Sequence, residues 1–188
     1  MTLSQERLLC AYILQVILAS IPIIYSRFTH RHLRNYGLKA TKQLLVQGVS
    51  LSVGIGVCLG LIGSPGTLTA EWFLLSCLLA PICEEFFFRG FLQTHAMESV
   101  RGGKKLLKFH LSYGLMFTAL VFGAVHLLDV FLLDLSVAQA IINASIVMLL
   151  GLLIGYVYQE TYSILTPIVM HSCLNGLSLI SFLAPIWF

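Results

Sequence analysis

Long apolar stretches follow one another along the chain, and short polar segments separate them. A helix needs roughly 20 apolar residues to cross a bilayer core of about 30 Å, and about six stretches approach that length. The expected membrane-spanning helices cover residues 8–25, 44–62, 72–93, 111–128, 138–158 and 162–187. The pattern predicts an all-α, polytopic membrane protein, built as a bundle of about six transmembrane helices.

Composition supports this prediction. Hydrophobic residues make up 58% of the chain and charged residues 10%, whereas a soluble domain carries about 25% charged residues. No polar linker, internal repeat or low-complexity tract divides the 188 residues. We therefore expect a single integral membrane domain over residues 1-188, inserted as a multi-pass protein.

The positive charges gather in two of the short polar segments. The segment after the first apolar stretch carries Arg27, Arg31, Arg34, Lys39 and Lys42, and the one after the third carries Arg101, Lys104, Lys105 and Lys108. Short basic segments of this kind mark the cytoplasmic side of a membrane. They form no stripe that follows phosphates, so the lipid bilayer is an expected partner and nucleic acid is not.

A cluster of charges interrupts the third apolar stretch. Glu84, Glu85 and Arg89 lie where a charged side chain costs about 2.5–3.5 kcal/mol on insertion scales. Glu85 and Arg89 are four residues apart and share a helix face, so we expect an ion pair that supports the helix. Glu84 is offset from Arg89 by about 140° and needs a partner on another helix.

Two later stretches carry polar residues at the same spacing. Phe122 and His126 lie four residues apart in the fourth stretch, and His171 and Asn175 lie four apart in the sixth. Each pair shares one helix face, so three helices direct polar side chains inward. Taken singly, each histidine fits a core position and Asn175 fits an interhelical hydrogen bond. Taken together, the set predicts an intramembrane polar cavity.

Prolines precede two of these polar positions. Pro81 lies three residues before Glu84, and Pro167 lies four before His171. Because proline has no backbone N–H, each is expected to leave an upstream carbonyl without its intrahelical donor. Such loosening admits water into a membrane helix.

Depth in the membrane constrains the fourth helix. The rise of about 1.5 Å per residue brings Glu84 and His171 to matching depths. His126 reaches that depth only if the fourth helix begins near residue 115 and continues past Asp129 to residue 133, and we predict that longer helix. Asp129 then either orients the His126 imidazole or is a solvated helix end. Asn143, in the fifth stretch, is interpreted as an interhelical hydrogen-bonding residue.

The four inward-facing polar residues suit the hydrolysis of an amide. Glu84 is the candidate general base, acting on a water that His126 positions. His171 and Asn175, one helical turn apart, are the candidate donors to the negative charge that develops on the carbonyl oxygen. This scheme predicts a metal-independent hydrolase with no cofactor and no covalent acyl-enzyme.

The order of the motifs resembles that of a protease family. EExxxR (Glu84, Glu85, Arg89), FxxxH (Phe122, His126) and HxxxN (His171, Asn175) resemble the CAAX-processing and bacteriocin-processing proteases, called CPBP or Abi, which are glutamate-type intramembrane endopeptidases. The resemblance covers a protease-like core at about residues 72–180.

The resemblance implies a role for each matching residue. Glu84 is then the general base with His126 on the water, His171 and Asn175 form the oxyanion hole, and Glu85, Arg89 and Phe122 are supporting residues. The implied substrate is a peptide or a membrane-anchored protein. Because the family's eukaryotic prenyl-protein proteases have additional helices, the short chain favours a small prokaryotic member in the plasma membrane.

Other functions fit the same residues. Glu84, His126 and His171 also make a possible ligand set for a catalytic zinc ion. Buried Glu, His and Arg residues mark ion or proton pathways in transporters as well, and a non-catalytic protein of this fold would act as an immunity or scaffold protein. Activity that survives Glu84→Gln would favour the non-catalytic alternatives, and loss of activity with a chelator would favour zinc.

Overall fold

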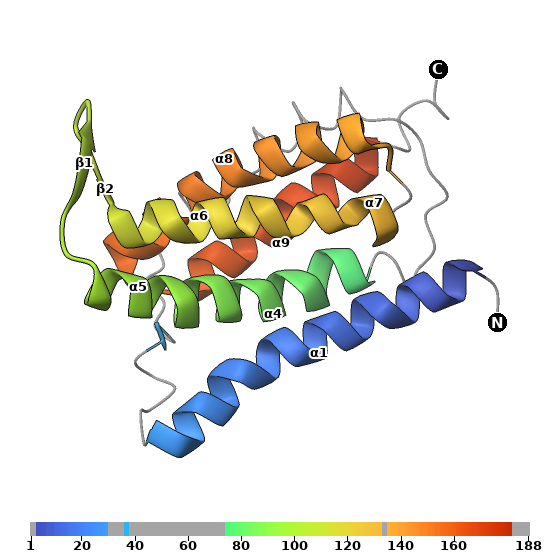
Figure 1. The fold of residues 1–188 in the computed structure, drawn as a ribbon, viewed down its shortest axis with the longest axis horizontal. Coiled ribbons are helices and arrows are strands. Elements are labelled where there is room, and N and C mark those ends of the chain that lie inside the picture. The colour runs from blue at the N-terminus through green and yellow to red at the C-terminus, as the bar shows by residue number, and fades with distance from the viewer. Residues whose placement is uncertain (1–2, 30–35, 38–73, 133–134, 182–188) are drawn as a thin grey trace.

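The computed structural model describes residues 3–29, 36–37, 74–132 and 135–181, and this part of the chain forms a bundle of helices with one small hairpin (Figure 1). In chain order the elements are α1 (Leu3–Thr29), η2 (Leu75–Leu79), α4 (Ala80–Glu85), η3 (Phe86–Gln93), α5 (Thr94–Ser99), β1 (Gly103–Leu106), β2 (Phe109–Ser112), α6 (Tyr113–Val125), η4 (His126–Leu128), α7 (Asp129–Leu132), α8 (Val137–Thr161) and α9 (Leu165–Ser181). Elements η2, α4, η3 and α5 follow one another directly, so the third apolar stretch is one long helix with two π-helical segments.

Three helices in the described part of the chain are long and apolar enough to cross a membrane. They cover Leu9–Thr29, Tyr113–Phe131 and Val137–Thr161. The predicted bundle of about six such helices is therefore supported for three of them. The third expected stretch is also helical where it is described, and the sixth is helical from Leu165 to Ser181. The expected second helix at 44–62 lies outside the described residues.

The bounds of the fourth and sixth helices differ from the ranges expected from the apolar stretches. The continuation of the fourth helix past Asp129 is confirmed, because α6, η4 and α7 run to Leu132 with a 3₁₀ turn at His126. Its start at Tyr113 is two residues earlier than predicted. The last helix begins at Leu165 rather than Tyr162, which ends α8 in a left-handed conformation. Pro167 therefore falls in the first turn of α9, where no intrahelical donor is needed, and the prediction that it leaves a carbonyl unpaired is wrong.

Small residues bring α6 and α8 close together. A Cβ atom on Gly123 would come within 2.6 Å of the Met148 side chain, and one on Gly155 within 2.5 Å of Leu115. On Gly151 it would meet the Phe122 ring at 3.1 Å. Such close packing of neighbouring side chains against glycines is typical of helices packed in lipid. These glycines let the helices of the fourth and fifth stretches pack closely against each other.

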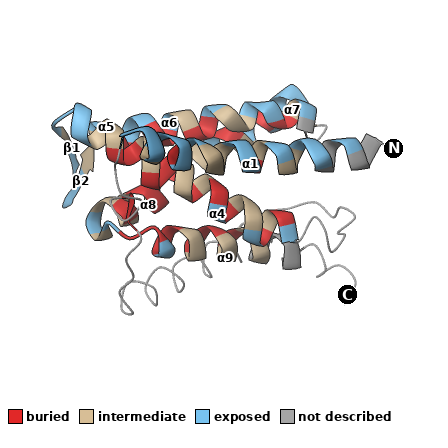
Figure 2. Ribbon diagram, turned by 90° about the horizontal axis from the view of Figure 1, so that it is seen from below, coloured by how far each residue is buried: buried red, intermediate tan, exposed pale blue. Residues whose placement is uncertain are grey.

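Helix α1 lies along the outside of the bundle. Figure 2 shows that most of its surface is exposed, whereas buried residues gather where α4, α6, α8 and α9 face one another. Gln15 and Pro22 are exceptions on α1 and are buried. The apolar centre between α8 and α9 includes Ile154, Met170 and Leu174.

A β-hairpin stands where a basic loop was expected, so the all-α prediction is wrong at this point. Strands β1 and β2 pair antiparallel, with Lys104 opposite Leu111 and Leu106 opposite Phe109. Gln159 of α8 secures the hairpin by accepting from Ser112 N and donating to the backbone of β2. The segment between the strands has none of the Asn-Gly or Gly-X signals that favour a tight turn, so the hairpin was not apparent from the sequence.

Candidate active site

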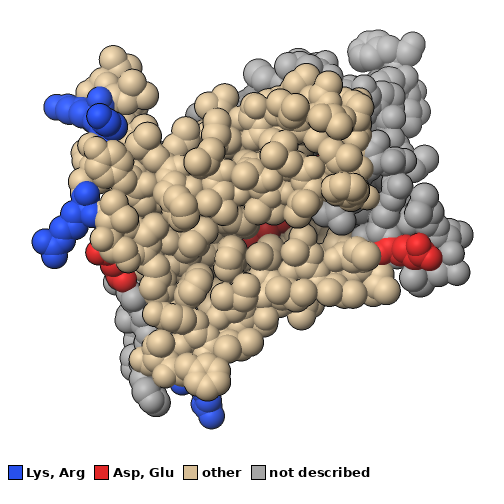
Figure 3. Space-filling view, viewed as in Figure 1, with Lys and Arg blue, Asp and Glu red and all other residues tan. Residues whose placement is uncertain are grey.

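A cavity of about 400 Å³ lies among α1, α4, α6, α8 and α9. Figure 3 shows acidic atoms recessed near the middle of this face of the molecule, whereas the other charged side chains in view lie toward its edges. The polar residues in the cavity wall are Gln15, Ser76, Glu84, His126, Asp129, Asn143, His171 and Asn175. The four predicted reactive residues, from three separate segments of the chain, therefore border one space.

Glu84 reaches the cavity from α4 and finds its partner on α1. The amide of Gln15 donates from Nε2 to Glu84 Oε1 at 2.9 Å. The prediction that Glu84 needs a partner from another helix is therefore confirmed, although that partner is Gln15. Among the described contacts, no hydrogen bond joins Glu84 directly to His126, and the two side chains share only the cavity wall.

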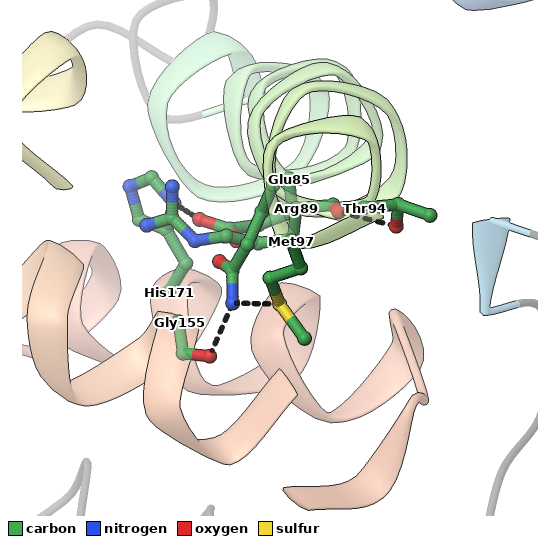
Figure 4. A network of polar contacts seen from close by, with 7 residues as sticks. Glu85, Arg89, Thr94, Met97, Gly155 and His171 are labelled. Carbon is green, nitrogen blue, oxygen red and sulfur yellow. Dashed lines mark hydrogen bonds and ion pairs between the residues drawn. The ribbon is translucent and has the colours of Figure 1, made fainter. Parts of the chain in front are cut away.

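Glu85 points away from the cavity into a buried charged cluster. Its Oε2 lies 3.1 Å from Arg89 Nε, which confirms the predicted ion pair, and its Oε1 lies 2.9 Å from His171 Nδ1. Figure 4 shows the imidazole of His171 reaching across from α9 to the Glu85 carboxylate. Glu85 and Arg89 are both fully buried. The contact between Glu85 and His171, which joins α4 to α9, was not predicted.

Phe122 forms the boundary between this cluster and the cavity. The Arg89 guanidinium carbon lies 4.6 Å from the centre of its ring, which is the geometry of a cation–π contact. The same ring lies 4.9 Å from the imidazole of His126 and 6.0 Å from that of His171. Phe122 therefore packs against both histidines and the buried arginine.

The 3₁₀ turn at the end of α6 sets the orientation of His126. Its backbone N–H bonds to Gly123 O rather than to the carbonyl four residues back. The imidazole takes that place, with Nδ1 at 2.9 Å from Phe122 O. Because a carbonyl can only accept, Nδ1 carries the proton, and Nε2 of a neutral ring is an acceptor.

Pro81 explains the position of Asn175. Ala80 N–H bonds to Leu75 O, five residues back. In the same register the next donor would be Pro81, which has no N–H, so Ser76 O needs another partner. Asn175 Nδ2 donates to Ser76 O at 2.8 Å. The prediction that Pro81 leaves an upstream carbonyl without its helical donor is confirmed.

Asp129 and Asn143 form a second polar contact in the wall. Asn143 Nδ2 donates to Asp129 Oδ2 at 2.7 Å, which confirms the interhelical role predicted for Asn143. Asp129 is 8% exposed, so the solvated helix end is wrong. In the described residues no hydrogen bond joins its carboxylate to His126, and the predicted orienting role is not seen.

Sequence reasoning missed Gln15. It is a polar residue within the first apolar stretch, and its isolation there was a signal, because membrane helices place such residues toward other helices. Its target was not apparent, since the pairing depends on how α1 packs against α4. The described residues also contain no group of three His, Cys, Asp or Glu side chains close enough to hold a metal ion.

Comparison with known proteins identifies the family to which the chain belongs. The sequence profile described as type II CAAX prenyl endopeptidase Rce1-like matches residues 66–177, more than half of the chain and all three motifs. The chain belongs to the Rce1-like family. No curated protein and no solved structure matches it. The predicted family is thus confirmed, and membership supports an integral membrane protein with a CAAX-type intramembrane protease function.

Proposed function

We propose that this Rce1-like protein is a metal-independent, glutamate-type intramembrane endopeptidase. It hydrolyses a peptide bond in a membrane-associated or leader-bearing protein or peptide. The observation that carries the proposal is the cavity wall, where Glu84, His126, His171 and Asn175 border one space of about 400 Å³. Ligand sites in proteins are typically concave spaces of about 300–1,000 Å³ with a few polar groups on apolar walls.

Glu84 and His126 hold the attacking water. The Glu84 carboxylate accepts hydrogen bonds, and Nε2 of His126 is an acceptor because Nδ1 donates to Phe122 O. Two acceptors fit the two hydrogens of one water and leave a lone pair on its oxygen for attack. Glu84 takes the proton as that oxygen bonds to the scissile carbonyl carbon.

His171 and Asn175 stabilise the oxyanion. Glu85 accepts from His171 Nδ1, so Nε2 of His171 donates to the oxyanion when the ring is doubly protonated. The Glu85 carboxylate, 2.9 Å from Nδ1, lies where it balances the positive charge of that ring. The Asn175 amide, fixed in direction by its bond to Ser76 O, is the second donor. Donors of this kind lower the barrier by meeting charge as it develops.

Collapse of the tetrahedral intermediate completes the reaction. The carbonyl re-forms, the C–N bond breaks, and protonated Glu84 returns its proton to the leaving amine. The products are a carboxylic acid and an amine, which together contain the atoms of the peptide and one water. Glu84 ends as a carboxylate, ready for another water.

The family description makes prenylated CAAX peptides the first substrates to test. Apolar residues from α1 and α8, including Leu14, Leu18, Val147 and Leu150, line much of the cavity. Such a wall suits the aliphatic side chains of a membrane-anchored peptide.

The decisive experiment compares purified wild type with Glu84→Ala. Both are incubated with farnesylated CAAX peptides, their unprenylated equivalents and leader-bearing peptides, and products are identified by mass spectrometry. Cleavage by the wild type alone supports the proposal, and equal cleavage by both proteins refutes it. Loss of wild-type activity with a strong chelator, restored by zinc, would replace the water-activating scheme by a metal-dependent one.

A further inference from the structure

Gln15 lies on the inner side of a helix that otherwise exposes most of its side chains. Gln15 is 5% exposed, whereas its neighbours Val16 and Ile17 are 63% and 50% exposed. Helix α1 lies outside residues 66–177, which match the family. Gln15 nevertheless lines the cavity beside Glu84. A residue outside the family match therefore reaches the proposed active site.

The two ends of the Gln15 amide have different surroundings. Nε2 donates to Glu84 Oε1 at 2.9 Å. Oε1 is buried and has no hydrogen-bond partner among the described residues. A buried acceptor without a donor is unfavourable, and such groups in native proteins call for an explanation. A peptide in the cavity supplies the missing donor, because its backbone N–H groups also need partners away from water.

We propose that Gln15 binds the substrate backbone and positions the general base at the same time. Its Oε1 accepts from an N–H of a peptide bond next to the scissile bond, while its Nε2 holds Glu84 Oε1. The bond to Oε1 leaves Glu84 Oε2 to face the water. One planar amide then couples peptide binding to the orientation of the carboxylate. This inference rests on the proposed function.

The test combines Gln15→Met with altered substrates. Methionine keeps the length of the side chain but removes its donor and acceptor. The probe is an internally quenched farnesylated CAAX peptide, and two analogues replace the peptide bond before or after the scissile bond by an ester, which removes one N–H. In the wild type we expect one analogue to lose about tenfold in kcat/KM. In Gln15→Met that analogue and the parent peptide are cleaved at equal rates.

Controls separate this role from a purely structural one. Val16→Met, on the exposed side of α1, is expected to keep the wild-type preference between parent and analogue. Gln15→Asn, which is too short to reach both partners, repeats the test if Gln15→Met does not fold. The inference is overturned if Gln15 variants keep the wild-type kcat/KM. It is also overturned if they lose rate but still prefer the parent peptide over the ester analogue as strongly as the wild type does. If such variants retain a cleavage that Glu84→Gln abolishes, the proposed function stands and only this inference fails.

A different observation concerns the β1–β2 hairpin. Pairing places Leu106, Phe109 and Leu111 on one face with Lys104, and Lys105 on the other. Leu106 at the tip is 60% exposed. The hairpin thus combines apolar and basic side chains on a small exposed element.

Leu107, in the turn, combines an exposed apolar side chain with an unfavourable backbone conformation. Its side chain is 84% exposed, and its backbone has φ 55, a left-handed conformation that L residues with a Cβ rarely adopt. An exposed apolar side chain on a strained backbone is better explained if the side chain contacts an apolar environment than if it contacts water.

The charge and position of the hairpin indicate what that environment is. Four exposed basic residues, Arg101, Lys104, Lys105 and Lys108, surround it, and Figure 3 shows basic side chains at this end of the molecule. No Asp or Glu occurs between residues 99 and 128. Strand β2 leads directly into a candidate membrane span that begins at Tyr113, and Figure 1 shows the hairpin running across the end of the bundle rather than along the helices.

The geometry points to an anionic lipid surface as the partner of the hairpin. The lysines contact lipid phosphates while Leu106 and Leu107 enter the boundary between headgroups and acyl chains. The element thereby fixes the depth of the adjoining span.

Tryptophan quenching tests this contact in the full-length protein. Leu107→Trp is introduced with Trp72→Phe and Trp187→Phe, and the protein is placed in vesicles of brominated phosphatidylcholine, alone or mixed equally with brominated phosphatidylglycerol. We expect stronger quenching in the anionic vesicles. Replacing Lys104, Lys105 and Lys108 by Gln is expected to remove that difference, whereas replacing them by Arg keeps it. Equal quenching in both vesicles, or a difference that survives the Gln variant, overturns the proposal.

Discussion

Glu84 and Glu85 are adjacent in the chain, but their carboxylates lie in two different regions of the molecule. Glu85 is fully buried between Arg89 of its own helix and His171 of α9. Glu84 lies in the cavity wall, only partly buried, and accepts a hydrogen bond from the neutral amide of Gln15. One carboxylate is enclosed between an arginine and a histidine, and the other is presented to an open space.

The difference lets one short motif support the fold through Glu85 and, in the proposed mechanism, carry the chemistry through Glu84. A buried carboxylate is tolerated when a cation and hydrogen bonds compensate for its lost hydration, as they do at Glu85. A carboxylate beside a cavity can contact a bound water, as the proposed general base must. Because successive helical residues are turned by about 100°, adjacent glutamates face these two environments without any break in the helix.

Glu84→Gln is expected to have the largest effect. Glutamine keeps the shape of the side chain but cannot accept the water's proton, so cleavage of the farnesylated peptide should fall by about 10²–10⁴-fold. The free energy of unfolding in detergent should stay close to the wild-type value. Glu6→Gln, at an exposed position of α1, serves as the control. If Glu84→Gln retained cleavage, Glu84 would not be the general base, and the proposed division between a reactive Glu84 and a structural Glu85 would be wrong.

Arg89→Met, unlike Glu84→Gln, should mainly lower the free energy of unfolding. It leaves the Glu85 carboxylate buried without its arginine, which typically costs about 3–5 kcal/mol. Chemical unfolding in detergent measures the loss. The double variant Glu85→Gln/Arg89→Met should lose less than the sum of the single variants, because no buried charge is left alone. Additive losses would contradict the buried ion pair.

Phe122→Leu should affect both regions, because the ring contacts Arg89 on one side and the two histidines on the other. We expect a loss of about 1–2 kcal/mol in the free energy of unfolding. Cleavage should fall by about 10-fold or more, since small displacements of reacting groups are costly. Phe117→Leu, exposed on the same helix, is the matched control. An effect confined to stability would remove Phe122 from the site.

Asn143→Leu should have the smallest effect. It removes the hydrogen bond to Asp129, and bonds of this kind between membrane helices contribute about 0.6 kcal/mol on average. The cleavage rate should change little, because Asn143 takes no part in proton transfer in the proposed scheme. A loss of activity comparable to that of Glu84→Gln would extend the reactive region to the Asp129–Asn143 contact.

Much of the site could be predicted because it depends on spacing within single helices. The Glu85–Arg89 pair, the shared face of Phe122 and His126, and that of His171 and Asn175 all follow from helical periodicity. The apolar lengths likewise predicted membrane helices, and the depth argument predicted that the fourth helix extends past Asp129. Local geometry fixes these features before the chain folds.

Tertiary structure decided which residues from different helices meet. The bond from Gln15 to Glu84 depends on the packing of α1 against α4, and the contact of His171 with Glu85 rather than with the cavity alone depends on the crossing of α9. The Asn175–Ser76 bond required both the π-helical register before Pro81 and the approach of α9. Helix rotation and crossing arise from side-chain packing between distant segments, so periodicity along one helix does not determine them.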